Sequence, residues 1–67
     1  MTKFEATKVI HGLIEADMNM KNYATGQIAD AVTKGETPDQ YHNDLMAKYE
    51  TNIAALTLAG MALTREV

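Results

Sequence analysis

The sequence contains no cysteine, serine or tryptophan, and its 67 residues include only one proline and four glycines. Without cysteine there is no disulfide scaffold, zinc–thiolate site or thiolate nucleophile. The eight threonines lie mostly at positions typical of helix caps and helix surfaces, so no activated hydroxyl nucleophile is expected. The four glycines are isolated, and none opens a phosphate-binding loop. We therefore expect no catalytic residues and no cofactor, and a protein that is not an enzyme.

Basic residues are also scarce, with six Lys and Arg against nine Asp and Glu and a net charge of -3. This balance argues against binding to a nucleic-acid backbone, which requires clustered Lys and Arg. The uncharged residues 52–64 are too few to span a bilayer as a helix. Acidic Glu5 and Glu15 interrupt any signal-peptide core. We expect one small domain, residues 1–67, that is cytoplasmic and binds neither nucleic acid nor membranes.

The clearest local signal, in the middle of the chain, is a helix end followed closely by a helix start. Gly35 suits the left-handed position just past a helix C-terminus. Thr37 is predicted to be an N-cap, and Pro38 fits the first helical position. Gln40 stands three residues after Thr37, as a capping box requires. This pattern predicts an αα-hairpin with its turn at residues 34–37.

The second predicted helix covers about residues 38–66. Its apolar positions follow the alternating spacing of four and three that is typical of packing along one seam. The seam positions are Leu45, Tyr49, Asn52, Leu56, Ala59 and Leu63, all of them apolar except Asn52. The polar Asn52 either fixes the register of pairing or lies at the edge while Ile53 takes its place. Residues 53–63 are apolar nearly all round, and a two-helix hairpin cannot bury both sides of one helix.

The first predicted helix covers about residues 3–33, and Thr2 with Glu5 forms a second capping-box pattern at its start. Its apolar face consists of Ala6, Ile10, Leu13, Ile14 and Met18. The pattern weakens over residues 19–26, where Asn, Thr and Gly lower helix propensity. Two interpretations fit: one long helix, with or without a kink, or two shorter helices that break near residues 22–25. We prefer one long helix, which matches the second in length.

Charged side chains of the first helix offer no strong site. His11 and Glu15 are four residues apart, which permits a weak divalent-metal site, but a solvated pair is the preferred interpretation, so no metal is expected. Asp17 lies within the apolar face. Because a lone buried carboxylate is costly, we expect Asp17 at the edge of that face unless Lys21 or Lys48 reaches it.

Together these patterns predict an all-α fold, an antiparallel hairpin of two long helices. Ordering such a chain costs on the order of 100 kcal/mol of conformational entropy, and a lone hairpin buries only one stripe per helix. We therefore expect hairpins to assemble into a helical bundle as a homo-oligomer, a dimer or higher. The predicted oligomer interface consists of Leu56, Leu58, Gly60, Met61 and Leu63.

Two functional hypotheses follow. The first is a protein–protein interaction module, an adaptor or inhibitor of the kind that viruses encode against host defences. The alternative is a homo-oligomer that sequesters a nucleotide-like anion in pockets between subunits. The partners expected are therefore a second copy, another protein and, under the alternative, a small nucleotide-like ligand. The predicted ligand- or partner-binding residues are Lys21, Asn22, Tyr23, Thr25, Tyr41 and Tyr49.

Overall fold

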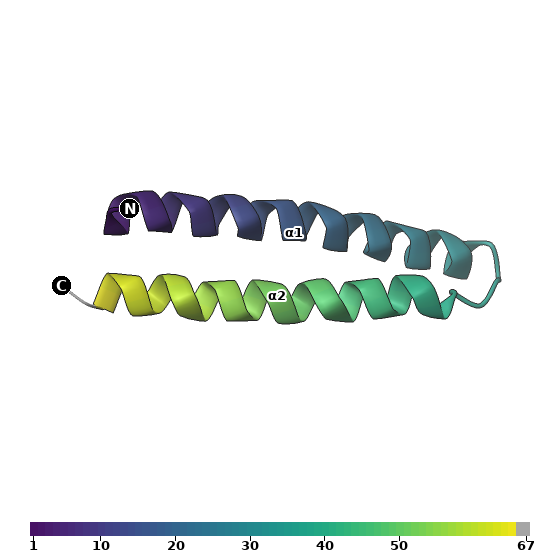
Figure 1. The fold of residues 1–67 in the computed structure, drawn as a ribbon. Coiled ribbons are helices and arrows are strands. Elements are labelled where there is room, and N and C mark those ends of the chain that lie inside the picture. The colour runs from purple at the N-terminus through teal and green to yellow at the C-terminus, as the bar shows by residue number, and fades with distance from the viewer. Residues whose placement is uncertain (66–67) are drawn as a thin grey trace.

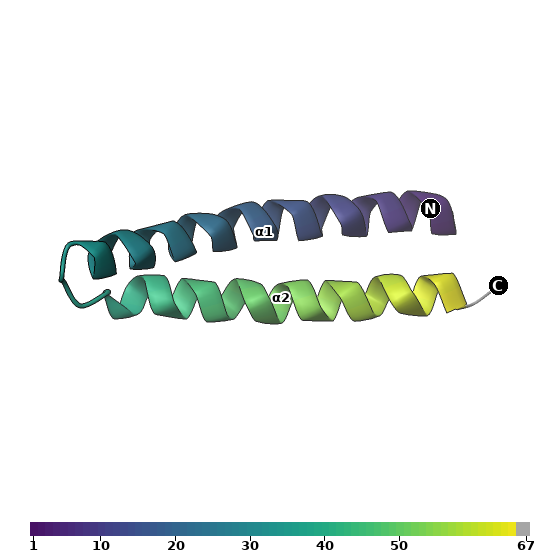
Figure 2. The same ribbon diagram turned by 180° about the vertical axis from the view of Figure 1, so that it is seen from behind.

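The computed structural model describes residues 1–65 and contains two α-helices, α1 (Lys3–Thr33) and α2 (Gln40–Arg65). The helices lie side by side and antiparallel, so the start of α1 and the end of α2 share one end of the molecule (Figure 1; Figure 2 shows the pair from behind). The molecule is a rod of 51 × 14 × 14 Å. The predicted all-α hairpin is confirmed. The predicted last helical residue, 66, lies outside the described residues.

Helix α1 begins with the predicted capping box. The Glu5 N–H donates to the Thr2 hydroxyl at 3.1 Å, and the Thr2 N–H donates to the Glu5 carboxylate at 3.3 Å. The helix then continues without a break for 31 residues, so the interpretation as two shorter helices is wrong. Ala24, within the segment of low helix propensity, is the one fully buried residue among those described. Contact with α2 at this point outweighs local propensity.

The turn starts with a Schellman motif, in which two amide N–H groups past the helix end bond back to its last carbonyls. The Gly35 N–H donates to the Val32 carbonyl at 3.0 Å, and the Glu36 N–H donates to the Ala31 carbonyl at 2.8 Å. Gly35 has φ of 74°, the left-handed conformation predicted for it. This conformation strains any residue that carries a Cβ, which explains the glycine.

Helix α2 begins at Gln40, two residues later than the predicted start at Pro38. The cap is Asp39, whose carboxylate accepts from the His42 N–H at 2.9 Å. The Gln40 amide donates to the Asp44 carboxylate four residues ahead, so it forms no capping box with residue 37. The prediction that residue 37 caps a helix starting at Pro38 is therefore wrong, and the turn extends to Asp39.

The two helices pack along one seam of partly buried residues with coiled-coil spacing. On α1 they include Thr7, Ile10, Ile14, Asp17, Lys21, Ala24, Ile28 and Ala31. On α2 they include His42, Leu45, Tyr49, Asn52, Ile53, Leu56, Gly60 and Leu63. Asn52 and Ile53 are both partly buried, so neither replaces the other at the seam.

The seam gives the hairpin very little enclosed interior. Among residues 1–65, eleven large apolar side chains remain exposed: Met1, Phe4, Val9, Leu13, Met18, Met20, Tyr23, Val32, Tyr41, Leu58 and Met61. Across residues 1–65, neither helix has a stretch both long and apolar enough to cross a membrane.

Candidate functional site

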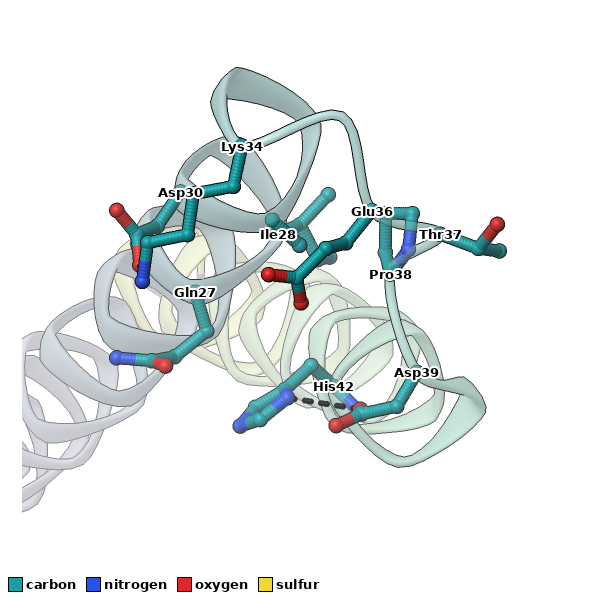
Figure 3. Close-up of a pocket in the computed structure, with 10 residues that line it drawn as sticks. Gln27, Ile28, Asp30, Lys34, Glu36, Thr37, Pro38, Asp39 and His42 are labelled. Atoms are coloured by element: carbon teal, nitrogen blue, oxygen red, sulfur yellow. Dashed lines mark hydrogen bonds and ion pairs between the residues drawn. The ribbon is translucent and has the colours of Figure 1, made fainter.

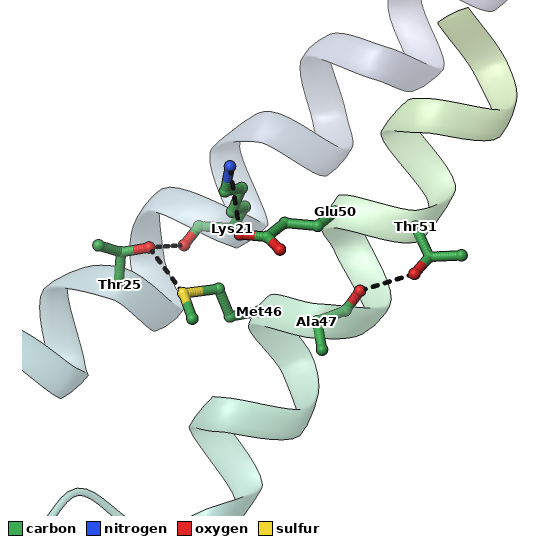
Figure 4. Close-up of polar contacts among 6 residues, drawn as sticks. All are labelled: Lys21, Thr25, Met46, Ala47, Glu50 and Thr51. Atoms are coloured by element: carbon green, nitrogen blue, oxygen red, sulfur yellow. Dashed lines mark hydrogen bonds and ion pairs between the residues drawn. The ribbon is translucent and has the colours of Figure 1, made fainter. Parts of the chain in front are cut away.

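Two of the predicted binding residues, Lys21 and Thr25, join the helices to each other. The Lys21 ammonium lies 3.6 Å from the Glu50 carboxylate on α2 (Figure 4). The Thr25 hydroxyl donates to the Lys21 carbonyl at 2.9 Å and lies 3.6 Å from the Met46 sulfur (Figure 4). Both side chains are thus engaged within the hairpin, on the side where α1 and α2 exchange polar contacts.

Asp17 follows neither sequence-based expectation. It lies on the seam and is partly buried, so it is not at an exposed edge. Within residues 1–65 the structure records no ion pair between Asp17 and a lysine. The Lys21 ammonium faces Glu50, and the Lys48 ammonium lies 5.9 Å from the centre of the Tyr49 ring. The seam therefore holds an unpaired carboxylate near its middle.

Tyr23 and Tyr41 both lie beside His42, which is not among the predicted binding residues. The His42 ring lies 6.0 Å from the Tyr23 ring in an edge-on arrangement and 5.3 Å from the Tyr41 ring. Both tyrosines are more than half exposed, whereas the His42 side chain is 21% exposed. The sequence did carry a signal for this position, because His42 stands three residues before Leu45 and so continues the heptad series of α2 toward the turn. The result is a surface aromatic cluster that joins the two helices near the turn.

The other two predicted binding residues lie apart from this cluster. Tyr49 is a partly buried seam residue, and Asn22 is exposed on α1. The six predicted residues therefore do not converge within one chain. A pocket for a nucleotide-like anion between subunits stays a prediction from the sequence.

Next to the turn is an open pocket of about 350 Å³ with a mostly polar lining (Figure 3). Four of its charged or titratable side chains have partners in the chain, and the fifth, Glu36, is exposed. Lys34 lies 3.1 Å from Asp30, and Nδ1 of His42 lies 2.8 Å from Asp39. The His42 N–H, which donates to the Asp39 carboxylate, lowers the pKa of Asp39 below its usual 3.8, and the His42 ring acts in the same direction.

The charged groups around the turn do not form a metal centre. In the part of the chain that the structure describes, no three His, Asp or Glu side chains gather as metal ligands. His11 and Glu15 are both exposed on α1. The side chains near the turn can therefore offer hydrogen bonds and charge to a ligand, but most of them are already paired with each other.

The predicted oligomer interface divides into two groups. Leu56, Gly60 and Leu63 are partly buried on the seam, and a Cβ built on Gly60 would lie 3.7 Å from the Ile10 side chain. Leu58 and Met61 are 66% and 44% exposed. Of the predicted interface, these two side chains are the ones accessible to another chain.

Comparison with protein-family models, curated proteins and solved structures finds no match for this chain.

Proposed function

We propose that this hairpin acts in the cytoplasm by binding other proteins through its exposed apolar helix faces, as a small acidic adaptor or inhibitor. The observation that supports this is a contrast within the described part of the chain, which has eleven exposed large apolar side chains and one fully buried residue, Ala24. Large apolar side chains left exposed on so small a protein are typical of surfaces that bind another molecule.

The exposed apolar groups concentrate away from the turn. Met1, Phe4, Val9 and Leu13 precede the midpoint of α1, and Leu58 and Met61 follow the midpoint of α2, so these six share the half of the rod away from the turn. Around the turn the exposed side chains are instead mainly polar or charged. A partner with an apolar patch beside a basic region would match both parts, because an apolar centre with a charged rim is typical of protein interfaces.

The test compares Leu58→Glu with a matched control, Asn22→Glu, which adds the same charge at an exposed polar position. Tagged wild-type protein is used to recover partners from cells of origin, and each partner is then purified and titrated. We expect Leu58→Glu to weaken binding at least tenfold, because a desolvated charge opposes an apolar contact, and Asn22→Glu to change it less than twofold. Binding of no protein at all, or equal effects of the two substitutions, would contradict the proposal.

A further inference from the structure

Helix α1 carries a second apolar stripe beside the seam that it uses within the hairpin. We call it the outer stripe: Ala6, Val9, Leu13, Ala16, Met20 and Tyr23. Its members are alternately three and four residues apart, as the seam residues are. Each member directly precedes a seam residue. Since each residue turns an α-helix by about 100°, the outer stripe lies about 100° around α1 from the seam. Val9 and Leu13 are each 50% exposed, and Tyr23 is 54% exposed.

The outer stripe faces away from the polar contacts between the helices. Thr25 and Met46, which touch each other, each directly follow a seam residue, so positions after the seam share one side of the pair. Positions before the seam share the opposite side, where α2 places Ala55, Ala59 and Ala62 toward its end but Asp44, Lys48 and Thr51 nearer the turn. This flank is therefore apolar on both helices only in the half of the rod away from the turn. The angle of about 100° between the stripes is close to the corner of a four-helix bundle.

We infer that the outer stripe binds a second copy of this chain, with the two α1 helices antiparallel about a two-fold axis. Pairing residues whose numbers add to 29 places Ala6 against Tyr23, Val9 against Met20, and Leu13 against Ala16. Every pair sets a smaller side chain against a larger one, the alternation that lets two surfaces interdigitate. A shift by one heptad in either direction leaves two of the six residues unpaired. The stripe carries no charge, so no like charges meet across the axis.

The glycines beside the stripe fit the same arrangement. A Cβ added to Gly12 or Gly26 would meet nothing within 4 Å, so the hairpin itself has no steric need for either glycine. Each costs a helix interior about 1 kcal/mol relative to alanine. Gly12 directly precedes Leu13 at the centre of the outer stripe, where absence of a side chain permits a second helix to approach closely.

The accessible area supports a partner of this size. The hairpin exposes 4973 Å², whereas a compact monomer of its 7.4 kDa mass would expose about 4,200 Å². The excess is roughly 750 Å², close to the ~800 Å² that each partner buries in a standard protein interface.

This inference rests on the proposed protein-binding function and names one partner, so it is tested by a method that needs no other protein. The sequence has no cysteine, so a disulfide between two chains can form only between introduced thiols. In Val9→Cys/Met20→Cys the two sites are eleven residues apart, about 16 Å along one helix, too far for a disulfide within a chain. In the antiparallel dimer each thiol faces the other site of the second copy.

After oxidation in a glutathione buffer at about 20 μM protein, we expect the double variant to form at least tenfold more covalent dimer than three controls. Val9→Cys alone and Met20→Cys alone test a parallel arrangement, and His11→Cys/Asn22→Cys has the same spacing on another flank. Circular dichroism at 222 nm verifies folding, and Ala6→Cys/Tyr23→Cys should cross-link equally. Light scattering of the wild type should give twice 7.4 kDa or a multiple of it.

Cross-linking of either double variant no greater than that of the controls would overturn the inference, and so would strong cross-linking of the single variants. If the double variants stay monomeric while Leu58→Glu still abolishes binding of another protein, the second copy is ruled out and the proposed function stands. If they cross-link as expected and no other protein binds, the dimer stands and the adaptor function fails.

Discussion

The middle of the seam carries charge where a helical pair gains most from apolar contact. Asp17 is partly buried there, between Ile14 and Lys21, and the Lys21 ammonium pairs with Glu50 instead. Replacing Asp17 with leucine would therefore place an apolar group in a site that is partly shielded from water. It would leave no partner charge buried and unpaired. We expect Asp17→Leu to stabilise the protein.

The size of the effect follows from the partial burial of this position. Full burial of a leucine side chain contributes about 1.5–3 kcal/mol, so partial burial gives about 1 kcal/mol. Leucine also favours the helix over aspartate by about 0.5 kcal/mol. A gain of about 1.5 kcal/mol in the free energy of unfolding would raise the Tm of a domain of this size by roughly 6–12 °C.

The assay is urea and thermal unfolding followed by circular dichroism at 222 nm, at one fixed protein concentration. Glu15→Leu is the matched control, because it also replaces a carboxylate on α1 with leucine but at an exposed position. We expect that control to change stability by less than about 0.5 kcal/mol. If Asp17→Leu gains no more than Glu15→Leu, or lowers stability, then Asp17 is not at a site that apolar packing can use.

Three further predictions concern the turn and assembly. Gly35→Ala should lower the free energy of unfolding by about 1 kcal/mol in urea titrations, because φ of 74° strains a residue with a Cβ, and an unchanged midpoint would contradict the left-handed turn. Asp39→Ala should lower the Tm at pH 7. The folded-state pKa of Asp39 lies below its usual 3.8, so the difference in Tm between the variant and the wild type should persist above about pH 5 and disappear as the pH falls through that pKa. A difference in Tm that stays constant with pH would exclude the carboxylate as its source. If the chain is a dimer, its Tm should rise by about 5 °C for each tenfold increase in protein concentration. This value follows from an unfolding entropy of about 2.1 cal/mol/K per residue summed over two chains. A Tm that does not change with concentration would indicate a monomer.

The helix ends show how far local sequence determines structure here. The start of α1 and the left-handed Gly35 were predictable, because each depends on residues within a few positions. The start of α2 was not, since Thr37 and Asp39 are both good caps. Asp39 is the cap in a turn where the His42 ring packs against Tyr23 across the pair. That contact joins residues nineteen positions apart, and no local pattern reveals it.

Four of the six predicted binding residues, all but Tyr41 and Tyr49, are close in sequence, and a helix does not convert closeness in sequence into closeness in space. Lys21, Tyr23 and Thr25 are separated by steps of two residues, and each step turns the helix by about 200°. Lys21 and Thr25 consequently contact α2 on one side, while Tyr23 reaches the His42 ring near the turn. Their tertiary partners could be identified only after the register of the two helices was known.

The apparent irregularity of the first half of the sequence has a physical cause in the two stripes of α1. The face predicted from sequence mixed Ile10 and Ile14, which belong to the seam, with Ala6 and Leu13, which belong to the outer stripe. Two stripes shifted by one residue spread apolar groups over a wide arc and so weaken the contrast that defines one amphipathic face. A helix with one apolar stripe needs one neighbour, whereas two stripes about 100° apart suit a corner position between two neighbours. Helix α2 supplies the first neighbour, and the outer stripe is the physical reason for placing a second helix beside α1.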